Sequence, residues 1–143
     1  MRKEKAKKYF YSGYNCAQAV FVSIAEDYGL SEQQALDISS PFGGGMGRLQ
    51  LTCGAVTGAL MALGLANKEI TPDKIRSKVY PDVIKFEKLF VEIHQSTCCR
   101  DLIKVDLLTD EGHKEFLDKD LKKVICEKCI FDAIDILEHK FNV

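Results

Sequence analysis

The stretch from Pro41 to Leu65 constrains the fold more than any other part of the chain. It opens on a cluster of glycines and then becomes a run of small and apolar residues without a formal charge after Arg48. Because glycine adopts backbone angles that other residues avoid, we predict a tight loop at its start. The spacing between Gly54 and Gly58, with alanines nearby, predicts a helix with a flat face that another backbone or a flat ligand can approach closely.

This predicted helix is too short to span a membrane. The segment from Cys53 to Leu65 has thirteen residues, whereas a bilayer requires about 20. We therefore interpret it as the buried central helix of a bundle.

Capping signals and apolar periodicity predict further helices on both sides of the central one. Asn15 and Ser31 are good N-cap residues, and Thr71 precedes a proline that suits the first helical position. Pro81 predicts a kink or break near Tyr80. The polar stretch from 109 to 120 is predicted to be a loop with a helical turn. The predicted helices cover residues 4–11, 16–28, 31–38, 53–64, 72–94 and 98–103, and a last helix begins at Leu121 or Cys126 and ends at Phe141.

No segment shows the alternation of apolar and polar residues that is typical of a strand, and there is no internal repeat. The sequence therefore predicts an all-α fold: a single domain over residues 1–143, with about five to seven helices around the central one. The flat helix face also favours a homodimer.

The overall charge excludes some classes of function. The net charge is -1, which gives no electrostatic basis for binding nucleic acid. No apolar run reaches the length of a transmembrane helix, and the basic start lacks the continuous apolar core of a signal peptide. We expect a soluble cytoplasmic protein without membrane insertion.

Six cysteines in a chain of 143 residues are the first functional indication. In a reducing compartment, cysteines are more often catalytic, redox-active or metal-binding than paired in structural disulfides. The alternative is that they fill the core as small apolar residues. That explanation would have to hold six times.

The predicted positions of the cysteines favour chemistry over packing. Cys16, Cys53 and Cys99 each fall at a predicted helix start, and Cys126 lies early in or before the last helix. The unpaired N–H groups and partial positive charge at a helix N-terminus stabilise a thiolate. We expect Arg48 and Arg100, which lie near two of these cysteines, to add to that effect.

These residues also carry a resemblance that covers nearly the whole chain. The motifs are GYNCAQ from Gly13, FGGGMG from Phe42, CGAVTG from Cys53, CRDL from Cys99, and a late cysteine at Cys126. In order and composition they resemble the C-GCAxxG-C-C family of redox-active proteins. The resemblance implies a small helical protein, a redox role, genes often found near those of transporters, and the signature cysteines Cys16, Cys53, Cys99 and Cys126. Cys98 and Cys129 are additional to that pattern, and Cys126 and Cys129 form a CxxC pair.

Three functional hypotheses remain open from the sequence. The first is thiol–disulfide chemistry with an unidentified redox partner, in which Cys53 is the nucleophile, Cys16 its first-choice partner, and Cys99 with Cys126 a second pair. The second is an iron–sulfur cluster or zinc held by the four signature cysteines. The third is an anion or small ligand held by the glycine-rich region, which comprises Gly43, Gly44, Gly45, Met46, Gly47, Gly54 and Gly58. The histidines His94, His113 and His139 are predicted to be surface residues.

Overall fold

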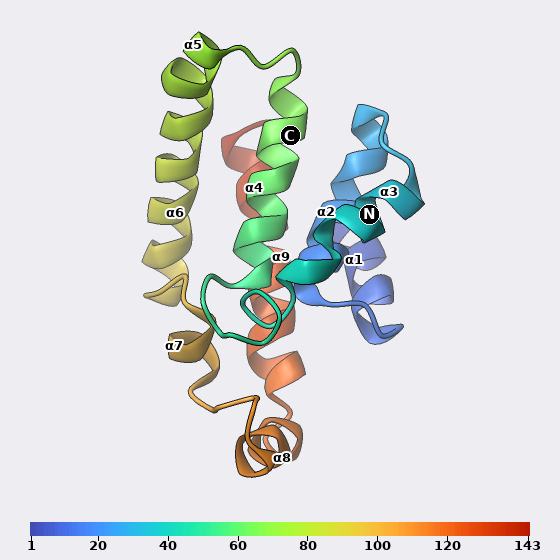
Figure 1. Ribbon diagram of the computed structural model, residues 1–143, viewed down its shortest axis with the longest axis vertical. Helices are drawn as coiled ribbons and strands as arrows, with labels where there is room; N and C mark the ends of the chain where they lie inside the picture. The colour runs from blue at the N-terminus through green and yellow to red at the C-terminus, as the bar shows by residue number, and fades with distance from the viewer.

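The computed structural model describes residues 1–143 and consists of helices and loops (Figure 1). Eight continuous helical segments are present and there is no strand, so the all-α prediction is confirmed with one helix more than the expected upper limit. In chain order the elements are α1 (Arg2–Tyr11), α2 (Cys16–Ala25), η1 (Glu26–Tyr28), α3 (Glu32–Ser39), η2 (Ser40–Phe42), α4 (Gly54–Asn67), α5 (Pro72–Lys74), η3 (Ile75–Val79), α6 (Tyr80–His94), α7 (Cys99–Ile103), α8 (Asp110–Asp118), η4 (Lys122–Glu127) and α9 (Lys128–Lys140).

The predicted helix starts are confirmed where a capping side chain is present. The side chain of Asn15 accepts a hydrogen bond from the Gln18 N–H at 2.9 Å, and the Asn15 N–H donates to the Gln18 side chain at 3.0 Å. Ser31 and Gln34 form the same reciprocal arrangement at the start of α3. These bonds satisfy N–H groups that have no partner within the helix.

Pro81 perturbs its helix without breaking it. The segment η3, directly before α6, is a π-helix, and Pro81 occupies the first turn of α6. A proline lacks the N–H that an α-helical turn would use, and its ring needs more room. The wider turns of η3 accommodate both effects, so the helix continues through Tyr80. Of the predicted kink or break, the break does not occur.

The prediction of a loop with a helical turn over 109–120 is also wrong, because α8 occupies most of this stretch. The Thr109 hydroxyl accepts a hydrogen bond from the Gly112 N–H at 2.9 Å, and Asp110 and Glu111 lie in the first turn. Both features stabilise a helix N-terminus. They outweigh the polar composition on which the loop prediction was based.

The flat face of α4 packs against α2 within the chain. A Cβ atom built on Gly58 would lie 2.7 Å from the Ala17 carbonyl oxygen, so the two backbones approach too closely for any side chain at this position. In Figure 1, α4 rises above the loop and α9 packs behind it, with α6 on the opposite flank from α1 and α2. The surface on which the homodimer prediction rested is therefore already covered, and the homodimer stays a prediction without that support.

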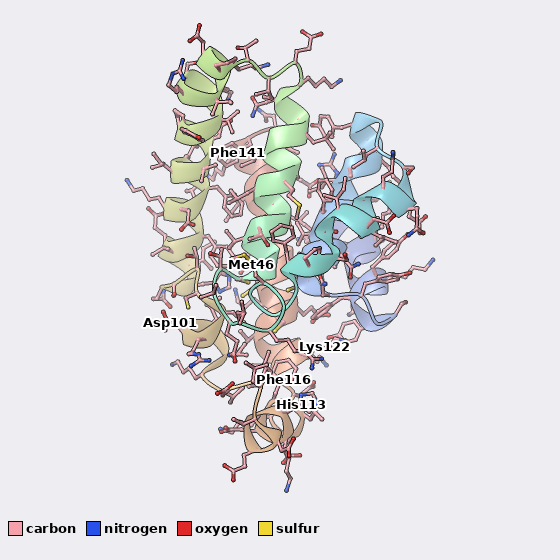
Figure 2. The ribbon with its side chains drawn as sticks, viewed as in Figure 1. Met46, Asp101, His113, Phe116, Lys122 and Phe141 are labelled. Atoms are coloured by element: carbon pink, nitrogen blue, oxygen red, sulfur yellow. The ribbon has the colours of Figure 1, made fainter.

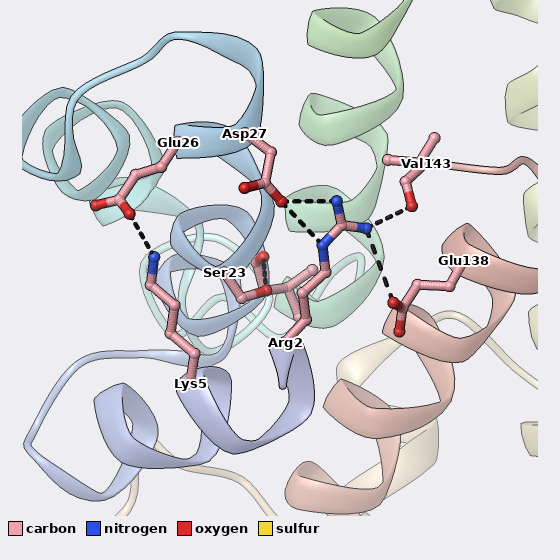
Figure 3. Close-up of polar contacts among 8 residues, drawn as sticks. Arg2, Lys5, Ser23, Glu26, Asp27, Glu138 and Val143 are labelled. Carbon is pink, nitrogen blue, oxygen red and sulfur yellow. Dashed lines mark hydrogen bonds and ion pairs between the residues drawn. The ribbon is translucent and has the colours of Figure 1, made fainter.

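The N-terminal helix is tied to the rest of the bundle by ion pairs (Figure 3). Arg2 lies 2.8 Å from the carboxylate of Asp27 and 3.9 Å from that of Glu138, and it also donates to the backbone carbonyl of Val143. Lys5 pairs with Glu26 at 2.7 Å. These contacts hold α1 against both α2 and the end of α9.

None of the helices combines the length and the apolar character that crossing a bilayer would require.

Candidate functional site: a cysteine-lined cavity

Five of the six cysteines line one cavity of about 530 Å³ near the N-terminal end of α4. They come from five different elements. Cys16 begins α2, Cys53 is the N-cap of α4, Cys99 begins α7, Cys126 lies in η4 and Cys129 lies in α9. The fold thus brings together the four cysteines predicted from the sequence and adds Cys129.

A short backbone pairing places Cys53 beside the start of α7. The Cys53 N–H donates to the Thr97 carbonyl at 2.7 Å, and the Cys99 N–H donates to the Leu51 carbonyl at 2.6 Å. Thr52 and Cys98 form an isolated antiparallel bridge. A pairing this short leaves no alternating pattern in the sequence, and the sequence analysis missed it.

Gln50 fixes the loop that follows α7. Its side chain is 1% exposed; it donates to the Val105 carbonyl at 2.6 Å and accepts from the Leu107 N–H at 2.8 Å. Both polar ends of the buried amide are satisfied, as burial requires. The bonds hold the loop after α7, so that Leu107 lines the cavity.

The glycine cluster forms a left-handed turn. Five consecutive residues, 44 to 48, have φ between 57° and 69°, and the loop is visible as the ring below α4 in Figure 1. Glycine tolerates this conformation, whereas Met46 and Arg48 adopt it at an energetic cost. Met46 lies on this ring in Figure 2.

The glycine-rich region divides into residues that reach the cavity and residues that serve packing. Gly43, Gly44, Gly47 and Gly54 line the cavity. The remaining members, Gly45, Met46 and Gly58, do not line it. A Cβ on Gly45 would lie 2.6 Å from the Leu51 N–H nitrogen, so this glycine allows two backbone segments to meet.

Gly54 makes room for a neighbouring sulfur. A Cβ at this position would lie 2.3 Å from the Cys16 sulfur, well inside the contact distance of the two atoms. The glycine that follows Cys53 thus allows the thiols of Cys16 and Cys53 to lie beside each other at the cavity wall. This contact gives a physical reason for the Cys-Gly sequence at the start of α4.

Cys53 is the one cysteine of the cavity with a lowered pKa. A hydrogen bond from the Cys129 thiol contributes most, and the N–H groups of Ala55 and Val56 in the first turn of α4 lower the pKa further, against the effect of burial. Neither N–H group makes a full capping hydrogen bond to the sulfur. These contacts favour the thiolate form of Cys53, with the neighbouring Cys129 thiol as the hydrogen-bond donor.

The other cavity cysteines are held as thiols. Burial, together with the charge of Cys53, raises the pKa of Cys16 to about 11 and that of Cys99 to about 12. Burial also raises the pKa of Cys126, and the hydrogen bond to Cys53 with burial raises that of Cys129. Desolvation disfavours each charge, and one thiolate nearby disfavours a second.

Cys126 lies early in the last helical stretch, which begins at Lys122, in agreement with the prediction. The expected effect of helix starts on the pKa does need correction. For Cys16 and Cys99, which do begin helices, burial outweighs the N–H groups and the pKa is raised. The expectation of a stabilised thiolate holds for Cys53 alone.

The two predicted arginines differ in their placement. Arg48 lines the cavity, whereas Arg100 does not. Arg100 does counteract the raised pKa of Cys99, although four other effects on that pKa are larger. The sixth cysteine, Cys98, also lies outside the cavity, and its thiol contacts the Gln50 carbonyl at 3.4 Å.

The charged side chains at the cavity are basic. Arg48 and Lys122 line it, His113 lies beside them, and no aspartate or glutamate lines it. Lys122 also lies 4.6 Å above the ring of Phe10, and Figure 2 shows Lys122, His113 and Phe116 near η4 and α8. Most of the other lining residues are apolar, so the cavity suits a small molecule with an apolar body and a negative charge.

Two sets of residues were missed or misjudged from the sequence. Cys129 was treated as additional, and its CxxC spacing to Cys126 was the available signal. His94 was predicted to be a surface residue, but its side chain is only 9% exposed, so that prediction is wrong. His94 is the last residue of α6, and it is buried because this helix end packs against α9. His113 and His139 are exposed as predicted.

The difference in pKa among the thiols predicts selective alkylation. In a Cys98→Ser background at pH 7, iodoacetamide should label Cys53 first, because the thiolate reacts and only Cys53 has a lowered pKa. Labelling of Cys16 should become fast only as the pH approaches 11. Peptide mass spectrometry over a pH series measures both. Equal labelling of Cys16 and Cys53 at pH 7 would contradict the assignment.

No group of three or more histidine, cysteine, aspartate or glutamate side chains is arranged to hold a metal ion.

One comparison with known proteins gives a match. The model of a family described as "Putative redox-active protein (C_GCAxxG_C_C)" matches residues 14–140. No curated protein and no solved structure matches the chain. The matched region includes all five cavity cysteines and the glycine turn.

Proposed function

Because the chain belongs to the C_GCAxxG_C_C family of redox-active proteins, we propose that it reduces small disulfides by thiol–disulfide exchange. The observation that carries this proposal is the pair formed by Cys53 and Cys129. Cys53 has a lowered pKa and borders a cavity, and the thiol beside it is one that can resolve a mixed disulfide.

The reaction takes place in two steps. The Cys53 thiolate attacks one sulfur of the substrate; the substrate S–S bond breaks, one thiolate leaves, and a mixed disulfide forms. The Cys129 sulfur then attacks the Cys53 sulfur, and the second substrate thiolate leaves. Two electrons pass from the protein to the substrate, which leaves as two thiolates. The Cys129 thiol releases one proton, and the protein retains a Cys53–Cys129 disulfide. A reduced dithiol returns the pair to its starting state by the same chemistry in reverse.

The cavity supports a substrate of limited size and negative charge. Its volume of about 530 Å³ lies in the range of small-molecule sites. Arg48 and Lys122 border it without a competing carboxylate. An organic disulfide with carboxylate groups fits both its apolar walls and its charge.

Replacing Cys129 tests the assignment of the resolving thiol. With dithiobisnitrobenzoate, an aromatic disulfide that carries two carboxylates, the fully reduced Cys98→Ser protein should rapidly release two equivalents of the coloured thiolate. The Cys98→Ser, Cys129→Ser protein should release one rapidly and retain a mixed disulfide on Cys53. Stopped-flow absorbance and peptide mass spectrometry measure these outcomes. The proposal is wrong if the Cys129 variant still releases two equivalents at the original rate, or if the oxidised parent protein lacks the Cys53–Cys129 disulfide.

A further inference from the structure

His94 contacts the resolving thiol from outside the cavity. Its Nδ1 atom lies 3.9 Å from the Cys129 sulfur. Its Nε2 atom lies 2.9 Å from the Asp132 carboxylate, although the ring is not aligned for a regular hydrogen bond and Nε2 has no other partner. A thiol, an imidazole and a carboxylate thus follow one another across the interface between α6 and α9.

The resolving step requires an acceptor for the Cys129 proton. Cys129 is 1% exposed, so water has little access to its sulfur. Once Cys53 is part of the mixed disulfide, it is neutral and no longer accepts the hydrogen bond from Cys129. The Nδ1 atom of a neutral His94 imidazole lies within reach of the Cys129 sulfur and can accept that proton.

From this geometry we infer that His94 is the general base of the resolving step and that Asp132 positions it. The inference rests on the proposed function. The proton leaves the Cys129 sulfur and goes to Nδ1 while the sulfur attacks Cys53, so an imidazolium forms beside the Asp132 carboxylate. The carboxylate stabilises this cation and orients the ring, as a carboxylate does for a histidine base elsewhere.

The protonation state of His94 is suited to this role. Burial lowers the pKa of His94, with the charge of Asp132 opposing and that of Lys128 assisting the change, so the ring is neutral at pH 7. Lys128 lies 2.7 Å from the same Asp132 oxygen. The ring of His94 also packs on Phe90, with 4.5 Å between the ring centres.

A second cavity provides an exit for the proton. It has a volume of about 560 Å³, and it is lined by His94 but by none of the cysteines. Asp101, Lys104 and Lys128 are the charged residues that line it. His94 therefore lies between the cysteine-lined cavity and a separate groove, and it can pass the proton to water without opening the active-site cavity.

The test separates the two releases of thiolate from dithiobisnitrobenzoate. In the Cys98→Ser background, His94→Phe retains a ring against Phe90 and removes the base. We expect its first release to keep the parent rate and its second to slow by at least about 30-fold, because general bases contribute roughly 10²–10⁴-fold. His139→Phe, at an exposed histidine of α9, is the matched control and should change neither phase.

The pH profile distinguishes a base from a structural residue. The parent rate of the second release should rise with pH through a midpoint below 6.5, the ordinary pKa of histidine, and then level off. The His94→Phe rate should lack this plateau and rise continuously as the thiol itself ionises. In Asp132→Asn the midpoint should move to lower pH, because Asp132 raises the pKa of His94.

Chemical rescue provides an independent check. In His94→Ala, added imidazole should restore the second release, since the missing ring leaves space that opens to the groove. An unchanged second release in both His94 variants would overturn the inference, and so would equal slowing of both releases. If the parent protein itself never gives a second release, the proposed function fails, which is a different outcome.

Discussion

Cys53→Ser should abolish the rapid reaction with disulfides. In the Cys98→Ser background we expect the first release of thiolate from dithiobisnitrobenzoate to slow by at least about 100-fold, because a serine hydroxyl is not ionised near neutral pH. The thiols that remain in the cavity have raised pKa values, so they should supply only a slow background reaction. Stopped-flow absorbance measures the rate.

The fold should survive this substitution. Cys53 is the N-cap of α4, and serine is among the preferred residues at that position. Circular dichroism and the free energy of unfolding should therefore match those of the parent protein. Loss of reactivity in a folded variant would assign the chemistry to the Cys53 sulfur, whereas a variant that reacts at the parent rate would show that another cysteine is the nucleophile.

Gly58→Ala and Gly64→Ala should change stability in opposite directions, although both replace a glycine of α4. A Cβ at Gly58 would lie 2.7 Å from the Ala17 carbonyl oxygen and 3.1 Å from the Val20 Cβ, so α2 and α4 would have to move apart. Such overpacking costs about 1–3 kcal/mol. At Gly64 no atom lies within 4 Å of the new Cβ, and alanine should stabilise the helix by up to about 1 kcal/mol.

Urea denaturation of the two variants and the parent measures this difference in the free energy of unfolding. The pair controls for helix propensity, since both sites are in the same helix and receive the same side chain. If Gly58→Ala proved as stable as Gly64→Ala, the close approach of α2 to α4 would be wrong. The packing of α2 on α4, which places Cys16 beside Cys53, would then lack this evidence.

The sequence was sufficient for most of the local structure. Asn15, Ser31 and Thr71 marked helix starts because a capping side chain acts on backbone groups within three residues of itself. The glycine cluster marked a turn because the backbone freedom of glycine is likewise a local property. The exceptions are Pro81 and α8. At Pro81 the missing N–H competes with the continuation of the helix, and in α8 the polar composition competes with the Thr109 cap and the acidic first turn.

The sequence by itself also identified the family, over residues 14–140, and its motifs gave Cys16, Cys53, Cys99 and Cys126 as the candidates for the chemistry. Their protonation states depend on burial and on neighbours distant in the chain, which only the tertiary structure decides. Cys53 and Cys129 are partners because α4 and α9 pack together, although 76 positions separate them in the sequence. His94 reaches Cys129 in the same way, from the end of α6. The burial of a histidine and the pKa of a thiol depend on how helices pack together. They cannot be inferred from the neighbouring residues in the sequence.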